Sequence, residues 1–227
     1  MFASHQLEKL IAEAAQWIRE HQERFWAITG TALISVLFIS LVIHHRQTEN
    51  DEAWFQLGSI QGQLMQGKFA EARSALSNWE PRFQGSDAGS YAKFMKADLF
   101  YKTTDYAQAS QLYGELAQTG RPDSVRPLAL SAEVTSEEMA GHIQQGQALA
   151  QTFLERYPDH YLAGPMYMTQ ARLAEMTSNA AAAAAIYDRF VLLFPQSPWT
   201  ALARARSQAL GGTAPRQNAL PAAPLPR

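Results

Sequence analysis

The sequence predicts an all-α protein in which a single N-terminal transmembrane helix is followed by an α-solenoid of about four helix pairs. Two observations support this fold class. An uncharged apolar run occupies residues 25–43, and an apolar pattern with a 37-residue period follows within residues 49–210. Periods of 20–50 residues are typical of solenoids, in which each repeat buries its apolar face against its neighbours.

The apolar run is long enough to cross a bilayer once. At about 1.5 Å per residue, its 19 residues span about 28 Å, close to the roughly 30 Å of a hydrocarbon core. A buried helix of a soluble domain normally carries a polar stripe, whereas serine and threonine are the only polar residues here. The run continues into His44 and His45 without the small residues of a signal-peptidase site, so we expect it to remain as an anchor. The chain has no cysteine, which excludes a lipoprotein-type acylation.

Basic residues beside the run predict its orientation. Lys9, Arg19 and Arg24 precede it, and Arg46 is the only basic residue in the next 20 or so positions. Because lysine and arginine are enriched on the cytoplasmic side, we expect the N-terminus in the cytoplasm and the large C-terminal part on the other side.

The two ends of the chain differ from the repeats. Apolar residues at helical spacing predict a cytoplasmic amphipathic helix in residues 1–24, which either docks on a membrane or a partner's helix or has no partner. Residues 211–227 contain four prolines and no aromatic residue, and they predict a disordered tail. Its last residues, PAAPLPR, resemble a polyproline ligand in outline, although a solvated tail is the simpler interpretation.

The repeat is defined by four apolar columns, each with one residue per copy. A proline follows the last column in every copy and is expected to close the preceding helix: Pro81, Pro122, Pro158 and Pro195. The columns are Phe69, Tyr106, Ile143 and Ala180; Ala72, Ala109, Gly146 and Ala183; Leu76, Tyr113, Ala150 and Tyr187; and Trp79, Leu116, Phe153 and Phe190. Small residues in the second column allow two helices to approach closely.

These columns resemble the tetratricopeptide repeat. Trp54, Leu57 and Gly58 match its W-x-x-L-G opening, and the turn Gly67-Lys68-Phe69 is followed by the small residue Ala72. Three features depart from the family pattern: the period is 37 rather than 34, Glu137 and Glu138 weaken the third copy, and Gly164-Pro165 begins the fourth. Proline is tolerated in the first turn of a helix, so we expect Pro165 to mark a helix start.

No catalytic motif is present in the sequence. It lacks G-x-S-x-G, H-E-x-x-H, a glycine-rich phosphate loop and a cysteine nucleophile, and its histidines are scattered. His44-His45 is interpreted as interfacial and Glu137-Glu138 as a solvated helix face. The net charge of −2 and the absence of a basic cluster argue against nucleic-acid binding. We therefore predict no enzyme activity, cofactor, metal or small-molecule substrate.

A protein-binding groove is the remaining candidate site. In stacked helix pairs, the first helix of each pair lines the concave side, where an extended peptide or a partner's helix binds. The candidates are Phe55, Ser59, Lys96, Glu133 and Gln170. The alternative is an ordinary solvated helix face, and a one-residue register error would turn each side chain by about 100°.

The whole arrangement resembles the YfgM-like family of bacterial inner-membrane proteins. The resemblance covers the short cytoplasmic helix, the anchor, the W-F-x-L-G segment and the G-K-F-x-E-A segment. It implies an ancillary translocon subunit whose periplasmic repeats bind translocating chains beside a periplasmic chaperone. Segments near Pro158 and Pro195 also resemble BamD-like assembly lipoproteins, which need an acylated cysteine, and the Tol-Pal coordinator, which has a cleaved signal.

The leading hypothesis is therefore a non-enzymatic adaptor or chaperone-like subunit in protein secretion or envelope biogenesis. The alternative is a scaffold of another envelope complex, such as division, pilus or polysaccharide-export machinery. A hydrolase would need catalytic residues that converge only in space. The partner's identity and the oligomeric state stay open.

Overall fold

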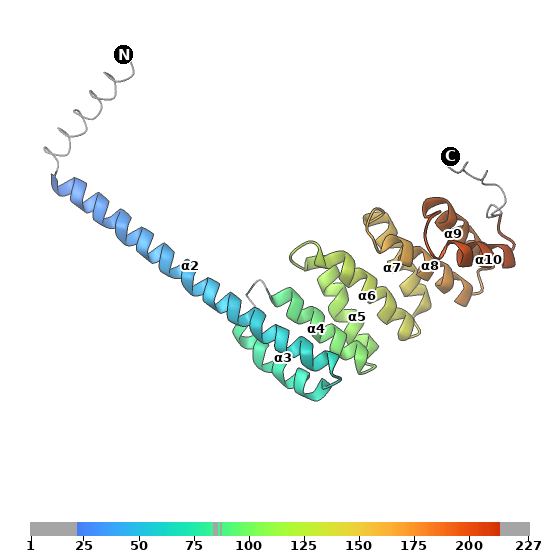
Figure 1. Cartoon of the computed structure of the whole chain (residues 1–227), viewed down its shortest axis with the longest axis horizontal. Helices are drawn as coiled ribbons and strands as arrows, with labels where there is room; N and C mark the ends of the chain where they lie inside the picture. Colours follow the sequence, from blue (N-terminus) through green and yellow to red (C-terminus); the bar gives the residue numbers. More distant parts are fainter. Residues whose placement is uncertain (1–21, 84–85, 87, 214–227) are drawn as a thin grey trace, which may run out of the picture. The chain divides into compact units, whose positions relative to one another are not determined.

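The computed structural model describes residues 22–83, 86 and 88–213, and this part of the chain is all α-helical, with nine helices and no strand (Figure 1). The helices are α2 (Gln22–Met65), α3 (Phe69–Phe83), α4 (Gly89–Lys102), α5 (Tyr106–Thr119), α6 (Val125–Met139), α7 (Ile143–Arg156), α8 (Ala163–Met176), α9 (Ala180–Leu193) and α10 (Thr200–Ala209). The amphipathic helix predicted for residues 1–24 falls outside the described residues up to residue 21. The predicted tail falls outside them from residue 214 onward.

Helix α2 contains the apolar run and extends beyond it to Met65. Its apolar side chains between Leu33 and Ile43 are exposed, apart from that of Val42, which is half-buried. Among the described helices, α2 is the one that is long and apolar enough to cross a membrane. The chain divides into two compact units, residues 1–52 and 53–227, so the C-terminal part of α2 belongs to the second unit.

The second unit has a 37-residue helical repeat. Four helices begin at the residues of the first predicted apolar column, Phe69, Tyr106, Ile143 and Ala180. The helices before them end at Met65, Lys102, Met139 and Met176, which are also 37 residues apart. Each of these four pairs of helices is therefore joined by a turn of three residues. The period read from apolar residues is the period of the helices themselves.

All four turns share one backbone conformation. The middle residue has a positive φ in each turn: Gly67 (73°), Thr104 (65°), Gly141 (83°) and Ser178 (57°). The next N–H donates to a carbonyl five residues back in every copy, as from Asp105 to Phe100 at 2.9 Å and from Asn179 to Ala174 at 3.0 Å. A left-handed residue with this bond satisfies the last carbonyls of a helix and reverses the chain.

Three of the four predicted apolar columns are buried. The column of small residues is buried in all copies, and so are the columns that begin with Leu76 and Trp79. The first column lies at the helix starts, where Phe69, Tyr106 and Ile143 are half-buried and Ala180 is exposed. Trp79 also donates its indole N–H to the carbonyl of Ala53 at 3.1 Å, which ties α3 to α2. The internal repeat thus identifies the core-facing side of α3, α5, α7 and α9.

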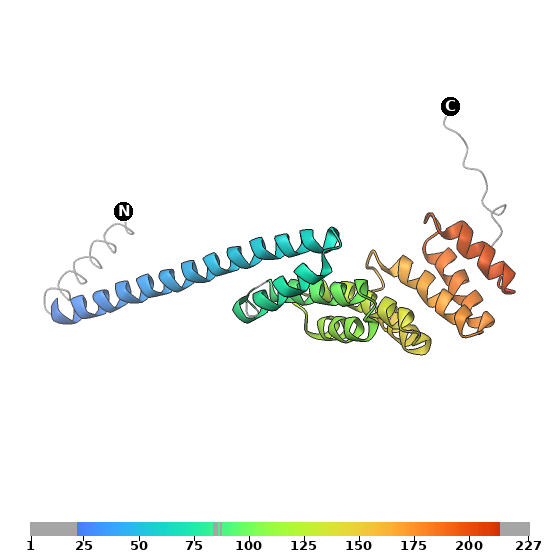
Figure 2. The same ribbon diagram turned by 90° about the horizontal axis from the view of Figure 1, so that it is seen from below.

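Helices α3 to α10 follow one another in chain order, and each contacts the next (Figures 1 and 2). One apolar cluster joins the end of α2 to α3 and α4, and a second joins α5 to α10. Between them, Tyr113 and Ala109 of α5 pack with Ala97 of α4. The second unit is accordingly stabilised by contacts between neighbouring helices.

Two predictions about individual residues are wrong. Pro81 does not close its helix, because α3 continues to Phe83, which is buried and packs against Trp79 with ring centroids 5.4 Å apart. Glu137 is not on a solvated face: it is buried between α5, α6 and the turn that follows α6. By contrast, Pro165 lies in the first turn of α8, as predicted.

Candidate functional site

The five residues predicted to line a groove come from four helices, α2, α4, α6 and α8. Phe55 and Ser59 are exposed on α2, and Phe55 is 81 % exposed. Lys96 of α4 pairs instead with Glu80 of α3 at 2.8 Å, so it contacts the preceding helix.

Glu133 and Gln170 also turn toward the preceding helix. The Glu133 carboxylate lies over Gly114 of α5, with Oε1 2.8 Å from the place that a Cβ on this glycine would occupy. Gln170 of α8 is only 8 % exposed and donates to Oε1 of Gln151 in α7 at 2.7 Å. Three of the five candidates therefore contact the preceding helix, and a binding role stays a prediction for all five.

These contacts recur with the repeat. The pairs that share a separation of 19 residues are Gly114 with Glu133, Gln151 with Gln170, and Asp188 with Ser207, whose hydroxyl donates to the carboxylate. In each pair, one residue belongs to the second helix of a repeat and the other to the first helix of the next. We call the positions of Glu133, Gln170 and Ser207, which are 37 residues apart, the polar column, and this column forms a recurring contact between repeats.

A cluster of carboxylates lies at the contact between α5 and α6. Glu137 accepts a hydrogen bond from the Ser110 hydroxyl and lies 2.8 Å from Nδ1 of His142. Glu133 is one helical turn before Glu137 and is partly buried. Its burial, and secondarily the negative charge of Glu137, raise the pKa of Glu133 to about 7. The serine bonds to the carboxylate and not to the histidine, which differs from the arrangement of an activated nucleophile.

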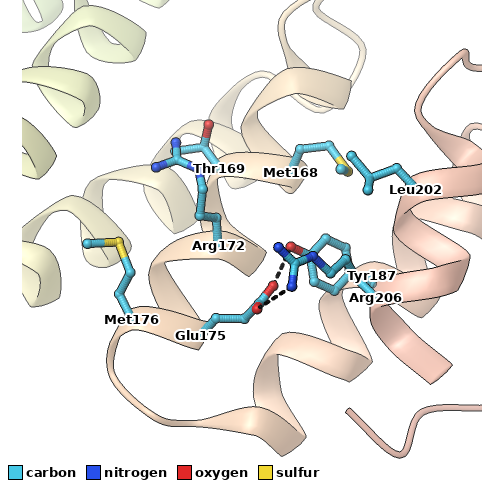
Figure 3. Close-up of a pocket in the computed structure, with 8 residues that line it drawn as sticks. All are labelled: Met168, Thr169, Arg172, Glu175, Met176, Tyr187, Leu202 and Arg206. Carbon is cyan, nitrogen blue, oxygen red and sulfur yellow. Dashed lines mark hydrogen bonds and ion pairs between the residues drawn. The ribbon is translucent and has the colours of Figure 1, made fainter. Parts of the chain in front are cut away.

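A concave site lined by described side chains lies between α8 and α10, over α9. It has a volume of about 480 Å³, and the residues that line it are Met168, Thr169, Arg172, Glu175, Met176, Tyr187, Leu202 and Arg206 (Figure 3). We call it the C-terminal groove. Five of its residues come from one face of α8, two come from α10, and Tyr187 of α9 lies between the two helices.

Charged groups in the groove form a connected set. The Tyr187 hydroxyl donates to Oε1 of Glu175 at 2.7 Å, and Arg206 pairs with Oε2 of the same carboxylate at 3.6 Å (Figure 3). Burial and the bond to Glu175 raise the pKa of Tyr187 to about 12, so its hydroxyl stays protonated and acts as a donor. Arg172 pairs with Glu138 of α6 at the other edge.

Both guanidinium groups remain open to solvent despite these pairs. The Arg172 side chain is 51 % exposed and that of Arg206 is 58 % exposed. Met176 and Leu202, also in the groove, are exposed as well. Single exposed apolar residues are common on protein surfaces, but here they share one concavity with two cations. Such a site can bind an extended segment that carries apolar side chains and a negative charge.

The C-terminal groove was not predicted from the sequence because its residues face a different direction on their helices from the predicted site residues. Thr169 and Arg206 immediately precede Gln170 and Ser207 in the chain, so they project about 100° away from the polar column. The spacing of Met168, Arg172 and Met176 on one face of α8 indicates an exposed stripe. No pattern within either helix alone shows that α10 places a second cation, Arg206, opposite these residues of α8.

Within the part of the chain that the structure describes, no three histidine, aspartate or glutamate side chains gather closely enough to hold a metal ion. Neither a protein-family model nor a curated protein matches the sequence.

Proposed function

We propose that this chain is a membrane-anchored, tetratricopeptide-like solenoid that binds segments of other proteins without acting on them chemically. The single observation that carries this proposal is the C-terminal groove, in which exposed apolar side chains and two guanidinium groups share one concave surface. Its walls are α8 and α10, which occupy the position of the first helix in successive repeats. Concave surfaces of this kind are used by solenoids for peptide binding.

The groove favours a ligand with a particular chemistry. Met176 and Leu202 offer apolar contacts to alternate side chains of an extended segment, while Arg172 and Arg206 can each bind a carboxylate. Tyr187 adds a fixed polar group between them. A polypeptide with apolar residues next to an aspartate or glutamate therefore fits better than a basic segment.

The cellular setting follows from the anchor and from the family resemblance. The exposed apolar part of α2 supports a single membrane pass. The bias of basic residues supports a cytoplasmic N-terminus and a repeat domain on the far side, which is the periplasm if the membrane is a bacterial inner membrane. The resemblance to YfgM-like proteins adds the translocon and periplasmic chaperones as partners, with translocating chains as clients.

Photocrosslinking in cells tests the groove directly. We expect a benzophenone amino acid in place of Leu202 or Met176 to capture other polypeptides, because both side chains lie in the groove. The same amino acid in place of Gln144, which is exposed on α7, is the matched control and should capture few. Equal capture at all three positions, or none at the two groove positions, would contradict the proposal.

Charge substitutions provide a second measurement. Arg172→Gln with Arg206→Gln should lower capture at position 202 by about tenfold, which corresponds to about 1.4 kcal/mol of binding free energy. Arg156→Gln on α7 removes an exposed arginine outside the groove and should leave capture unchanged. Thermal unfolding of each purified variant shows whether the fold is retained.

The captured partners discriminate the two kinds of binding protein. A chaperone-like adaptor is expected to yield many weakly bound clients together with translocon or chaperone subunits. A scaffold of division, pilus or polysaccharide-export machinery should instead yield one partner in a fixed ratio. Affinity purification in mild detergent followed by mass spectrometry measures which of these holds.

A further inference from the structure

A second concavity lies between the two loops that precede α8 and α10. Its volume is about 430 Å³. It is lined by Pro158, Asp159 and Tyr161 before α8, by Pro165 in the first turn of α8, and by Phe194 and Trp199 before α10. We call it the aromatic cleft. It shares no lining residue with the C-terminal groove.

The aromatic cleft has the chemistry of a proline-binding surface. Tyr161 is 73 % exposed, and Trp199 is also exposed. The ring of Tyr161 packs against that of His160 with centroids 4.4 Å apart, which holds it in place. Grooves lined by aromatic side chains bind proline-rich segments, because a polyproline II helix is already ordered and loses little entropy on binding.

The chain itself contains such a segment. Residues 214–227 include Pro221, Pro224 and Pro226, and the first two form a P-x-x-P motif. In a polyproline II helix of three residues per turn, Pro221, Pro224 and Arg227 lie on the same face. The segment carries two arginines and no acidic side chain, whereas the one carboxylate that lines the cleft is that of Asp159.

The attachment point of this segment brings it within reach of the cleft. Thr213 is held on α9, where its N–H and hydroxyl donate to Oδ2 of Asp188 at 2.9 and 3.1 Å. Phe194 is six residues beyond Asp188, or about 9 Å along a helix. The eight residues from Thr213 to Pro221 extend about 25 Å as polyproline II.

We propose that residues 214–227 bind in the aromatic cleft of their own chain, with Pro221 and Pro224 against Tyr161 and Trp199 and with Arg227 beside Asp159. The proposal is independent of what the C-terminal groove binds.

Fluorine NMR of the full chain in detergent tests this assignment. The five tryptophans are replaced by 5-fluorotryptophan, and Trp199→Phe identifies the resonance of position 199. We expect this resonance to differ between the full chain and a chain that stops at Thr213. A synthetic peptide of residues 214–227, added to the shortened chain, should return it toward its position in the full chain. An unchanged resonance in the shortened chain would overturn the proposal.

Substitutions in the segment separate specific binding from a general effect of its removal. Pro221→Ala with Pro224→Ala in the full chain should move the Trp199 resonance to its position in the shortened chain. Gln217→Ala with Asn218→Ala is the matched control and should not. Asp159→Asn should weaken binding of the peptide up to about fivefold, as expected for an exposed ion pair. If the proline substitutions have no effect, or if the resonance depends on protein concentration, the intramolecular assignment is wrong.

Discussion

Glu133 shows how a single side chain in the repeat is adapted to its neighbours. Its position corresponds to Lys96 and Gln170, which form polar contacts with the preceding helix. In the α5–α6 pair the preceding helix offers Gly114, so the carboxylate packs over a bare backbone. Because Glu137 lies one turn away, the charged form of Glu133 is disfavoured by both burial and repulsion.

The raised pKa of Glu133 predicts that the protein loses stability as pH rises. The ordinary value of 4.5 applies to the unfolded chain and a value of about 7 to the folded one, so the folded state binds the extra proton between these limits. The stability that this group contributes is therefore full below pH 4.5, falls as pH rises from about 4.5 to about 7, and is lost above that. Glu133→Gln should stabilise the protein by about 1–2 kcal/mol at pH 8 and have little effect at pH 4.

Urea unfolding of the detergent-solubilised chain at pH 4, 6 and 8 measures this effect. Glu71→Gln, in an exposed position on α3, is the control and should leave the dependence of stability on pH nearly unchanged. If wild type and Glu133→Gln show the same pH dependence, Glu133 is ionised in the folded state and the prediction fails.

At the scale of elements, the four three-residue turns share one conformation, with a positive φ at the middle residue and the same backbone hydrogen bond, although their sequences differ. Two of the four left-handed residues are Gly67 and Gly141, and the other two are Thr104 and Ser178. A side chain in this conformation places its Cβ near the following carbonyl, at a cost of about 1–2 kcal/mol. Threonine is branched at Cβ, which makes Thr104 the most strained of the four.

Thr104→Gly should therefore stabilise the protein by about 0.5–1 kcal/mol. The substitution removes backbone strain from the folded state, and this gain is larger than the free-energy cost of the additional conformational entropy that a glycine gives the unfolded chain. The matched substitution Gly141→Thr introduces the same residue into an equivalent turn and should destabilise by about 1–2 kcal/mol. The midpoints of urea unfolding measure both effects, and two shifts of the same sign would show that the turns are not equivalent.

At the scale of the whole molecule, the exposed apolar part of α2 contrasts with the packed helices that follow it. Leu37 is 69 % exposed, and nearby apolar residues on α2 are similarly exposed. Leu192 on α9 is 68 % exposed, but it does not belong to a long apolar run. The proposed membrane anchor would account for the first group, because a bilayer would replace water around all of these side chains at once.

Charges in α2 should release the protein from the membrane. Each arginine at the centre of a spanning helix costs about 2.5–3.5 kcal/mol of insertion free energy. Leu33→Arg with Leu37→Arg, both near the centre of the apolar run, should move most of the protein out of the membrane fraction after carbonate washing. Leu192→Arg with Leu193→Arg makes the same chemical change on α9 and should leave the protein in the membrane fraction. Retention of the α2 variant would argue against a transmembrane anchor.

The sequence by itself determined the all-helical class, the apolar run and the 37-residue period at which α3, α5, α7 and α9 begin. These features depend on local preferences repeated at a fixed interval, because apolar residues at helical spacing define one face of each helix. The buried columns followed because equivalent positions in a repeat meet equivalent neighbours.

Only the tertiary structure decided which polar faces are buried and which are open. Glu137 looked solvated, but Ser110 of the neighbouring α5 gives it a buried partner. Arg172 and Arg206 are 34 residues apart and meet in one groove because α8 and α10 both pack on α9. Such convergence depends on the rotation of each helix about its axis. That rotation is set by contacts with other helices, and the period of a single sequence does not contain it.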